Sequence, residues 1–214
     1  MRRLIMRSTT ILLAVSMPII VGCLGLGGGT RTPTKFYVLH SMQSSEDEIQ
    51  PIAKLPDTSI GVGPIRLPQY LDRPQIVRRS SQNQLELAEF AQWAEPIRVN
   101  FSRVLAENLG ILLDTKKISL FPWLKTTQID YQIILEITRF DGGQGNNALL
   151  RASWSIFGID SKNMLVHHYS SYSEPAEAND TEALVAAQGQ TVKHLSREIA
   201  QALQALVNGE SSSQ

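Results

Sequence analysis

Cys23 is the only cysteine of the 214-residue chain, and the residues before it indicate which chemistry its thiol undergoes. Arg2, Arg3 and Arg7 lie at the start without an acidic neighbour, and an apolar run from Ile11 to Val21 follows. A basic start, a short apolar segment and small residues before a cleavage site are typical of a secretory signal peptide. The apolar run is too short to cross a hydrocarbon core of about 30 Å, which needs about 20 residues.

The end of this stretch predicts a covalent lipid. Its last four residues, Ile20-Val21-Gly22-Cys23, resemble a bacterial lipobox, in which a peptidase cuts before a cysteine that already carries lipid. We therefore expect residues 1–22 to be a lipoprotein signal peptide and Cys23 to be the lipidation site. The alternative is an ordinary signal peptide with a free thiol nearby. Leu24 stands where an aspartate would favour retention in the inner membrane, so we expect an outer-membrane protein that faces the periplasm.

The other residues able to bind metals or act as nucleophiles form no recognisable site. His167 and His168 are adjacent on an expected strand, so their side chains point to opposite faces and cannot bind one metal ion. His194 lies on an expected helix with Arg197 and Glu198 three and four residues later, a pattern typical of a solvated face. The sequence has no nucleophile elbow, P-loop or zinc-protease motif. We therefore expect no enzyme, no metal site and no cofactor besides the covalent lipid.

One glycine-containing stretch has the spacing of a dinucleotide-binding fingerprint. Gly143, Gly145 and Ala148 follow an expected strand. The fingerprint requires a helix to come next, so that the helix N-terminus faces the pyrophosphate. The ten residues that follow here alternate in polarity, which predicts a hairpin loop instead.

The charge balance excludes a basic nucleic-acid-binding surface. The chain has 20 Lys and Arg residues against 20 Asp and Glu residues, and three of the basic residues precede Cys23. The processed chain would therefore have 17 basic and 20 acidic residues. Neither a nucleic-acid footprint nor a polybasic membrane patch fits this balance. Without a second cysteine, the fold must be stabilised by its core alone.

The chain divides into four expected regions. After the signal peptide, residues 23–33 are rich in glycine and lack periodicity, so we expect a flexible tether. Residues 34–208 are long enough for one domain with a well-buried core. Residues 209–214 are polar and are expected to form a disordered tail.

Hydrophobic periodicity predicts the elements of this domain. Helices are expected over Pro96–Leu113 and from about Thr181 to Val207, and Asn179 and Glu182 have the spacing of a capping box. Strands are expected at 35–40, 59–67, 75–78, 84–90, 131–140, 150–156 and 165–173. The third and fourth strands form a hairpin, and Pro64 indicates an edge position or a bulge in the second. The pattern predicts an α+β two-layer sandwich: a mixed or antiparallel sheet with two amphipathic helices on one face.

A loop stiffened by prolines follows the 59–67 strand. It carries, in order, Pro68, Tyr70, Leu71, Asp72, Arg73 and Pro74. A loop with fixed φ angles that presents an aromatic and an aliphatic side chain is a candidate preorganised contact surface. The candidate partner-contact residues are Pro68, Tyr70, Leu71, Asp72, Arg73 and Trp93. The alternative is that Tyr70 and Leu71 fill the end of the core.

Several stretches of the chain carry a resemblance to a known family. They are the Leu-Pro-x-Tyr-Leu-Asp-Arg-Pro-x-Ile-Val run from Leu67, the Trp-Ala-Glu-Pro run from Trp93, and the segments 105–109, 182–187 and 195–199. Through them the chain resembles the ABC-type transport auxiliary lipoproteins, of which the PqiC-like proteins are the best-known branch.

This resemblance implies a lipoprotein that works with an MCE-domain protein and, in many systems, with an ABC permease and its ATPase. Such systems move phospholipid or other hydrophobic molecules between two membranes, and the family brings no catalytic residue. The implied role is that of a docking subunit held by the lipid anchor. Because MCE assemblies are rings, a homo-oligomeric receiver is a further expectation. Two alternatives stay open: a periplasmic lipoprotein that binds lipid or another apolar ligand beneath its two helices, and a purely structural envelope lipoprotein.

Overall fold

The computed structural model describes residues 32–42, 50–143, 146–158, 163–178 and 180–211. Residues Thr34–Gln214 form one compact unit. All the helices and strands described below belong to this unit. The expected signal peptide, Cys23 and most of the expected tether lie outside the described residues, as do Gly145 and Asn179.

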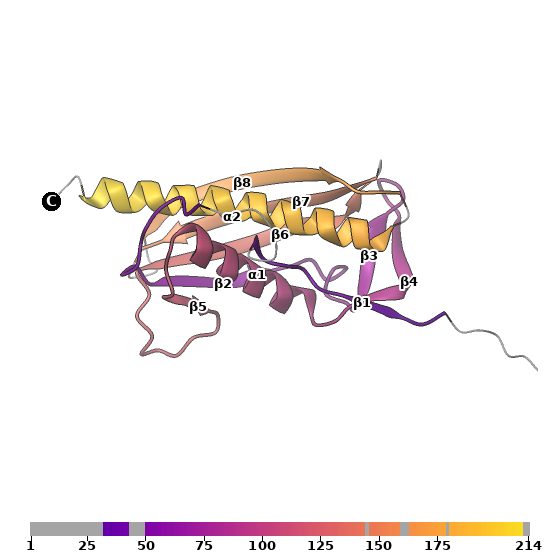
Figure 1. Ribbon diagram of the computed structural model, residues 1–214, viewed down its shortest axis with the longest axis horizontal. Helices are drawn as coiled ribbons and strands as arrows, with labels where there is room; N and C mark the ends of the chain where they lie inside the picture. The colour runs from indigo at the N-terminus through magenta and orange to yellow at the C-terminus, as the bar shows by residue number, and fades with distance from the viewer. Residues whose placement is uncertain (1–31, 43–49, 144–145, 159–162, 179, 212–214) are drawn as a thin grey trace, which may run out of the picture. The chain divides into compact units, whose positions relative to one another are not determined.

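The described part of the unit contains eight strands and two helices (Figure 1). In chain order they are β1 (Lys35–Tyr37), β2 (Ile60–Arg66), β3 (Gln75–Arg79), β4 (Leu85–Trp93), α1 (Ile97–Leu112), β5 (Ile118–Leu120), β6 (Tyr131–Gly143), β7 (Asn147–Phe157), β8 (Met164–Pro175) and α2 (Thr181–Ser211).

All eight strands belong to one mixed sheet that is built around the long strand β6. One side of β6 pairs in parallel with β2, which in turn pairs in parallel with β5. The other side pairs with β7 in an antiparallel hairpin, and β8 continues this meander. Near its end β6 also pairs with β3 at Arg78. From there β3 runs antiparallel to β4, and β1 lies parallel to β4.

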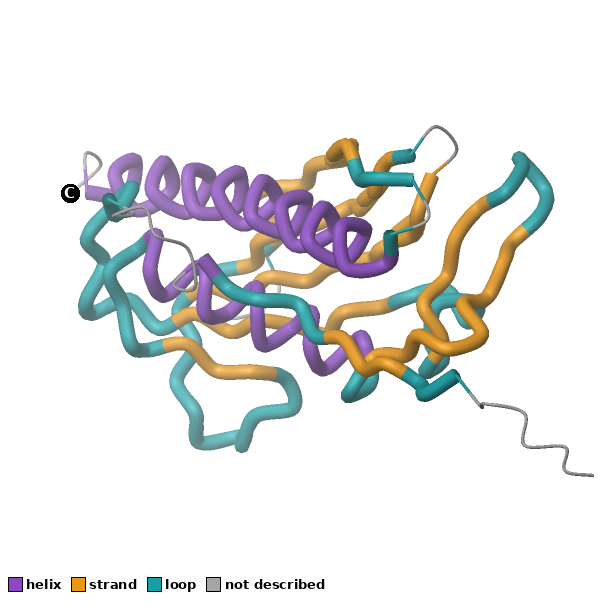
Figure 2. The backbone as a smooth tube through the Cα atoms, turned by 45° about the vertical axis from the view of Figure 1, so that its right-hand side comes forward, coloured by secondary structure: helices purple, strands orange, loops and turns teal. Residues whose placement is uncertain are grey.

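Both helices cover the same face of this sheet, as Figures 1 and 2 show. The helix α1 packs against β2 and β5, α2 packs against β6, β7 and β8, and the two helices contact each other. The strand pattern follows from this arrangement: Ile133, Leu135 and Ile137 are buried beneath the helices, whereas Glu136 and Thr138 on the opposite face are exposed. The expected α+β two-layer architecture, with both helices on one face, is confirmed.

The helix α1 forms where the period of its apolar residues predicts it. Ile97, Phe101 and Val104 lie three to four positions apart and are fully buried. The ring of Phe101 meets Phe140 of β6 edge-on, with centroids 5.3 Å apart, which joins the helix to the sheet. Pro96 immediately precedes the helix, one residue before the first turn in which we expected it.

The sheet differs from the sequence-based expectation at two positions. The three-residue strand β5 was not expected, because so short a run has no measurable alternation. Pro64 does not lie in an edge strand, since β2 has β5 on one side and β6 on the other. Instead, the register of the β2–β6 pair shifts between Val62 and Ile65, so the bulge alternative is correct. A shift of register accommodates a residue that cannot donate a ladder hydrogen bond.

The last helix begins at Thr181, as expected, and differs at its C-terminal end. The carboxylate Oδ1 of Asp180 accepts the N–H of Glu182 at 2.8 Å and caps the first turn. The expected capping box includes Asn179, which lies outside the described residues. At the other end α2 continues to Ser211, and residues 209–211 therefore belong to the helix and not to the expected tail. The hydrophobic stripe ends earlier because the last turn of an exposed helix need not be buried.

The expected hairpin after β6 is confirmed. Gly143 pairs with Asn147 across an antiparallel turn, and Asn146 has a φ of 57°. Because the chain returns as strand β7, there is no helix N-terminus to face a pyrophosphate, and the dinucleotide-binding interpretation is excluded.

Candidate functional site

The proline-containing segment between β2 and β3, residues 67–74, folds back onto its own domain. The side chains of Leu71 and of Trp93 at the end of β4 are only 4% and 7% exposed, and both belong to the main hydrophobic cluster. The carbonyl of Pro68 accepts the N–H of Leu71 at 3.0 Å, and the N–H of Trp93 donates to the carbonyl of Pro74 at 2.7 Å. Leu71 therefore fills the end of the core, as the alternative interpretation of this loop expected.

Tyr70 connects the same segment to a buried charge cluster. Its hydroxyl donates to Oδ2 of Asp141 at 3.1 Å and lies 3.3 Å from the carbonyl oxygen of Thr138. The guanidinium of Arg79 lies over its ring, 6.0 Å from the centroid. Burial, and then the neighbouring Asp141 carboxylate, raise the pKa of Tyr70 above its ordinary value of 10.0, because both disfavour the phenolate. The side chain of Tyr70 thus connects the 67–74 segment to β6.

Asp141 of β6 is completely buried, and two arginines neutralise it. Arg139 donates through Nη2 to Oδ1 at 2.5 Å and through Nε to both carboxylate oxygens, at 3.1 and 3.0 Å. Nη2 of Arg79 lies 3.5 Å from Oδ2. The hydrogen bonds to Asp141 raise the pKa of Arg139 above its ordinary value. The side chains of this cluster thus connect β3, β6 and the 67–74 segment.

The outer side of the segment carries the groups that solvent can reach. Oδ2 of Asp72 accepts from Nη2 of Arg98 at 2.5 Å, and both side chains are close to half-exposed. Arg73 is partly buried, and its Nε has no hydrogen-bond partner among the described residues. Contact with a partner stays a prediction for all six candidate residues, with Asp72 the most accessible of the charged ones.

The two adjacent histidines of β8 point to opposite faces, as the strand period predicts. Nδ1 of His167 lies 2.9 Å from Oγ of Ser155 on the open face. Nε2 of His168 lies 2.9 Å from Oε1 of Glu198 on α2. In the ranges that the structure describes, no group of three or more His, Cys, Asp or Glu side chains could hold a metal ion.

His194 does not lie on a purely solvated face of α2. Its Nε2 is 3.0 Å from Oε1 of Glu174 on β8, and its ring stacks on Tyr172 with centroids 5.6 Å apart. The hydroxyls of Tyr172 and Ser170 each donate to Oε2 of Glu198 at 2.5 Å. These polar contacts hold α2 against β8. The sequence pattern had indicated that this side of α2 faces solvent.

Two buried asparagines of α1 position the first residues of the domain. Asn100 Oδ1 accepts the N–H of Leu39 at 2.7 Å, and Asn108 Oδ1 accepts the N–H of Met42 at 2.8 Å. Asn108 also donates through Nδ2 to Oγ of Ser196 on α2 at 3.1 Å. The sequence pattern did not predict this function of the two asparagines. Asn100 and Asn108 are eight residues apart, which places both side chains on the apolar side of the helix. This spacing is the feature of the sequence that could have indicated their role.

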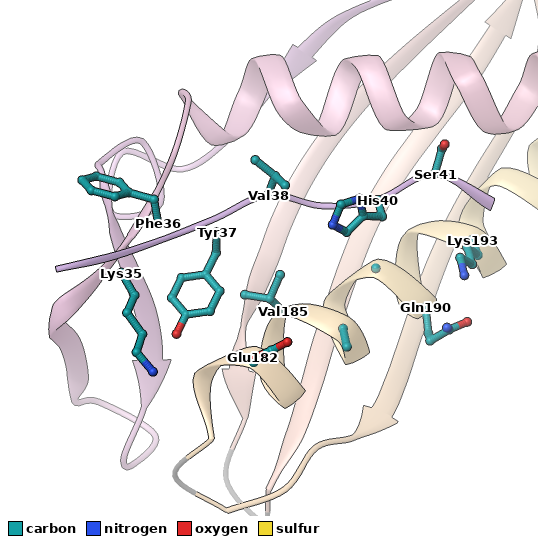
Figure 3. Close-up of a pocket in the computed structure, with 12 residues that line it drawn as sticks. Lys35, Phe36, Tyr37, Val38, His40, Ser41, Glu182, Val185, Gln190 and Lys193 are labelled. Carbon is teal, nitrogen blue, oxygen red and sulfur yellow. The ribbon is translucent and has the colours of Figure 1, made fainter. Parts of the chain in front are cut away.

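The N-terminal segment held in this way forms one wall of an open groove of about 700 Å³ (Figure 3). The first half of α2 forms the opposite wall. In Figure 3, Lys35 and Tyr37 extend toward the side of Glu182 and Val185, whereas Phe36 points away from it. The lining residues include the apolar Tyr37, Val38, Val185 and Ala186 and the charged or titratable Lys35, His40, Glu182 and Lys193. This combination can hold an apolar chain with a polar head, and it lies beside α2 rather than beneath both helices.

Attachment to a membrane rests on residues outside the described ranges. Lipidation of Cys23 therefore stays a prediction. None of the helices in the described part of the chain has the length and hydrophobicity needed to cross a bilayer.

Comparisons with known proteins place these features in context. A family model described as "ABC-type transport auxiliary lipoprotein component" matches residues 37–200, from the end of β1 into α2. None of the curated proteins matches the chain.

Two solved structures share the fold. Protein XCC0632 from Xanthomonas campestris, assigned to family DUF330, superposes with a TM-score of 0.67 at 16% identity, covering 85% of this chain and 99% of that chain. An uncharacterized protein superposes with a TM-score of 0.65 at 15% identity, covering 80% of this chain and 99% of that chain. At such identities the likeness shows the fold alone.

Proposed function

Because the chain belongs to the family of ABC-type transport auxiliary lipoprotein components, we propose that it is the docking subunit of a trans-envelope transport system for lipid or another hydrophobic molecule. In this proposal a lipid on Cys23 anchors the chain in the outer membrane, facing the periplasm. Residues 23–33 form a flexible tether that lets the domain stand away from the membrane. The domain binds an MCE-domain protein, and the ABC permease and ATPase of the same system supply the energy.

The observation that carries this proposal is the extent of the family match. It covers the domain from β1 to well inside α2, so the whole two-layer unit belongs to the auxiliary component. The segment 67–74, the most specific part of the resemblance, supports a docking role because Leu71 and the Tyr70–Asp141 hydrogen bond hold it rigidly. A rigid surface loses little conformational entropy when it binds a partner.

Capture of the lipidated chain from detergent-solubilised envelopes tests the docking role. We expect an MCE-domain protein to co-purify, and we expect Asp72→Arg to reduce its amount by reversing the charge on the accessible side of the segment. Asp57→Arg is a matched control, because Asp57 also pairs with one exposed cation, Lys117, but lies outside the segment. Failure of the unaltered chain to retain any MCE-domain protein would contradict the proposal.

Mass spectrometry of the N-terminal peptide tests the anchor separately. We expect acyl groups on Cys23 and recovery of the chain with outer-membrane vesicles, whereas Cys23→Ser should release the chain from the membrane fraction. An unmodified chain in the soluble periplasm would refute the anchor without bearing on the docking surface.

The groove beside α2 favours a second candidate function, namely binding of an apolar ligand by the domain itself. Its walls combine apolar side chains with lysines at positions 35 and 193. Native mass spectrometry after gentle extraction should then find a bound amphiphile. Gly189→Trp should displace it, because a side chain at Gly189 has open space around it in the groove. An empty wild-type domain would exclude a carrier role.

A further inference from the structure

A second proline-containing segment begins at Leu120, the last residue of β5, and most of its apolar side chains are exposed. Leu120, Phe121 and Leu124 are 41%, 52% and 75% exposed, although they lie within five residues of one another. Figures 1 and 2 both show the chain after β5 extending beyond the edge of the sheet. We call residues 120–125 the apolar loop.

The apolar loop is ordered despite this exposure. The N–H of Phe121 donates to the carbonyl of Val62 at 3.0 Å, which continues the pairing of β5 with β2. The rings of Phe121 and Trp123 meet edge-on, with centroids 5.4 Å apart. Gly61 of β2 makes room for this pair, because a Cβ atom there would lie 2.8 Å from the indole of Trp123. The exposed side chains are therefore presented on a fixed backbone.

Exposed lysines lie on both sides of the apolar loop. Between Thr115 and Ile129 the sequence contains three lysines, and Asp114 and Asp130 bound this stretch. Lys116, Lys117 and Lys125 are all exposed, and Lys117 pairs with Asp57 from another segment. Lys116 and Lys125 are therefore the exposed cations beside the loop, although the charges of the whole chain balance.

We propose that the apolar loop inserts into the headgroup region of a phospholipid bilayer that contains anionic lipids, and that this contact orients the domain on the membrane. Aromatic and aliphatic side chains flanked by lysines are the composition of interfacial segments. Lysines next to such a segment are attracted to anionic headgroups. Leu120, Phe121, Pro122 and Leu124 carry no polar side-chain atom, so the tip suits a hydrocarbon boundary better than a polar protein surface. The inference goes beyond the proposed docking function and does not depend on the proposed anchor, which would only raise the concentration of the domain at the bilayer.

Tryptophan fluorescence provides the test, because the three tryptophans differ in their surroundings. Trp93 and Trp154 are buried in the core, whereas Trp123 belongs to the apolar loop. The full chain isolated from membranes is reconstituted in vesicles of phosphatidylcholine and phosphatidylglycerol, with or without bromine on the acyl chains. Brominated chains quench an indole that touches them. We expect a loss of emission in the brominated vesicles that Trp123→Phe no longer shows.

Two variants make the test specific to the loop. Leu124→Glu changes an exposed side chain, so the fold should persist while the quenching by brominated lipid is lost. Val99→Glu is the matched control, since Val99 is a half-exposed apolar residue on α1, and it should keep the quenching. Equal emission of the wild-type chain in both vesicle types, or full quenching in Leu124→Glu, would overturn the proposal.

The experiment tests the lipidation of Cys23 and the membrane insertion of the apolar loop separately. If the N-terminal peptide proves to lack acyl groups, the chain is added to the same vesicles from solution, and the loop proposal still requires quenching of Trp123. Quenching that disappears in neutral phosphatidylcholine vesicles would support the role of Lys116 and Lys125.

Discussion

Two segments of this domain share a proline, an aromatic residue and a leucine but have opposite surroundings. Each places a leucine directly after an aromatic residue and follows a proline: Tyr70-Leu71 after Pro68, and Trp123-Leu124 after Pro122. Leu71 is 4% exposed and Leu124 is 75% exposed. Prolines and aromatic residues thus predict an ordered loop, but they do not predict which side chains the loop presents.

The neighbours of each segment explain the difference. Residues 67–74 connect two strands that both pair with β6, so Leu71 is drawn over the end of the core and Tyr70 reaches the buried Asp141. The apolar loop follows β5, which pairs only with β2 in the described sheet. Its Trp123 rests on Gly61, and no element of the described structure covers Leu124.

The largest effect is expected from the charge cluster beneath the first segment. Asp141→Ala leaves Arg139 and Arg79 without their buried carboxylate, which we expect to cost about 3–5 kcal/mol of unfolding free energy. Urea unfolding measures this change, and limited proteolysis should show earlier cleavage within 67–74. Asp72→Ala removes only a half-exposed ion pair with Arg98 and should cost at most about 1 kcal/mol. Equal losses in the two variants would contradict the role of Asp141.

The two leucines test the comparison directly. Leu71→Ala removes a buried side chain from the core and should lower the free energy of unfolding by about 2–5 kcal/mol. Leu124→Ala removes an exposed side chain and should change it by no more than about 0.5 kcal/mol. Chemical denaturation of both variants under one condition gives the difference. Similar values would mean that the two segments are not packed as differently as the structure indicates.

Gly61→Ala should disturb the apolar loop without touching the segment 67–74. The new Cβ would lie 2.8 Å from the indole of Trp123 and 3.0 Å from Cγ2 of Ile129. We expect a loss of about 1–3 kcal/mol from this overpacking and a shift of the Trp123 emission to longer wavelength. Gly189→Ala is the control, since its Cβ meets nothing within 4 Å and should improve helix propensity. An unchanged emission in Gly61→Ala would show that Trp123 does not rest on this glycine.

The smallest effect is expected from the hydroxyl of Tyr70. Tyr70→Phe removes its hydrogen bond to Asp141 and should cost about 0.5–1.5 kcal/mol at neutral pH. Because the pKa of Tyr70 is raised in the folded state, its contribution is complete below the ordinary pKa of 10.0 and is lost as the pH rises through the higher folded value.

The pH profile therefore distinguishes the two proteins. Unfolding free energies measured from neutral to alkaline pH should fall more steeply for the wild type than for Tyr70→Phe. Tyr172, whose pKa is also raised by burial and by Glu198, is present in both proteins, so its contribution cancels. Parallel profiles would show that Tyr70 does not titrate against Asp141.

Much of the fold follows from the sequence because its elements repeat with clear periods. The stripe of Ile97, Phe101 and Val104 locates α1 to within a residue, and the alternation from Tyr131 to Ile137 locates β6. Such patterns are local, and burial of one face of a helix or strand reproduces them in the structure. The family resemblance in the segments around Leu67 and Trp93 is confirmed by the match over residues 37–200.

The strand order and the candidate sites required the tertiary structure. Nothing local places β2 between β5 and β6, because Pro64 is compatible with either an edge or a bulge. The roles of Asn100 and Asn108 depend on backbone atoms about sixty residues away in the chain. Likewise, His194 pairs with Glu174 because β8 lies opposite this part of α2, and the local sequence does not show which strand lies there.

The sequence by itself determined the two helices, most of the strands, the two-layer class and the family of this protein, because each is encoded in short-range periodicity or in contiguous motifs. Only the tertiary structure decided that Leu71 is core and Leu124 is surface, that Asp141 is buried between two arginines, and that a groove follows the first half of α2. These properties arise from contacts between residues distant in the chain. Similar combinations of a proline, an aromatic residue and a leucine therefore acquire different exposures.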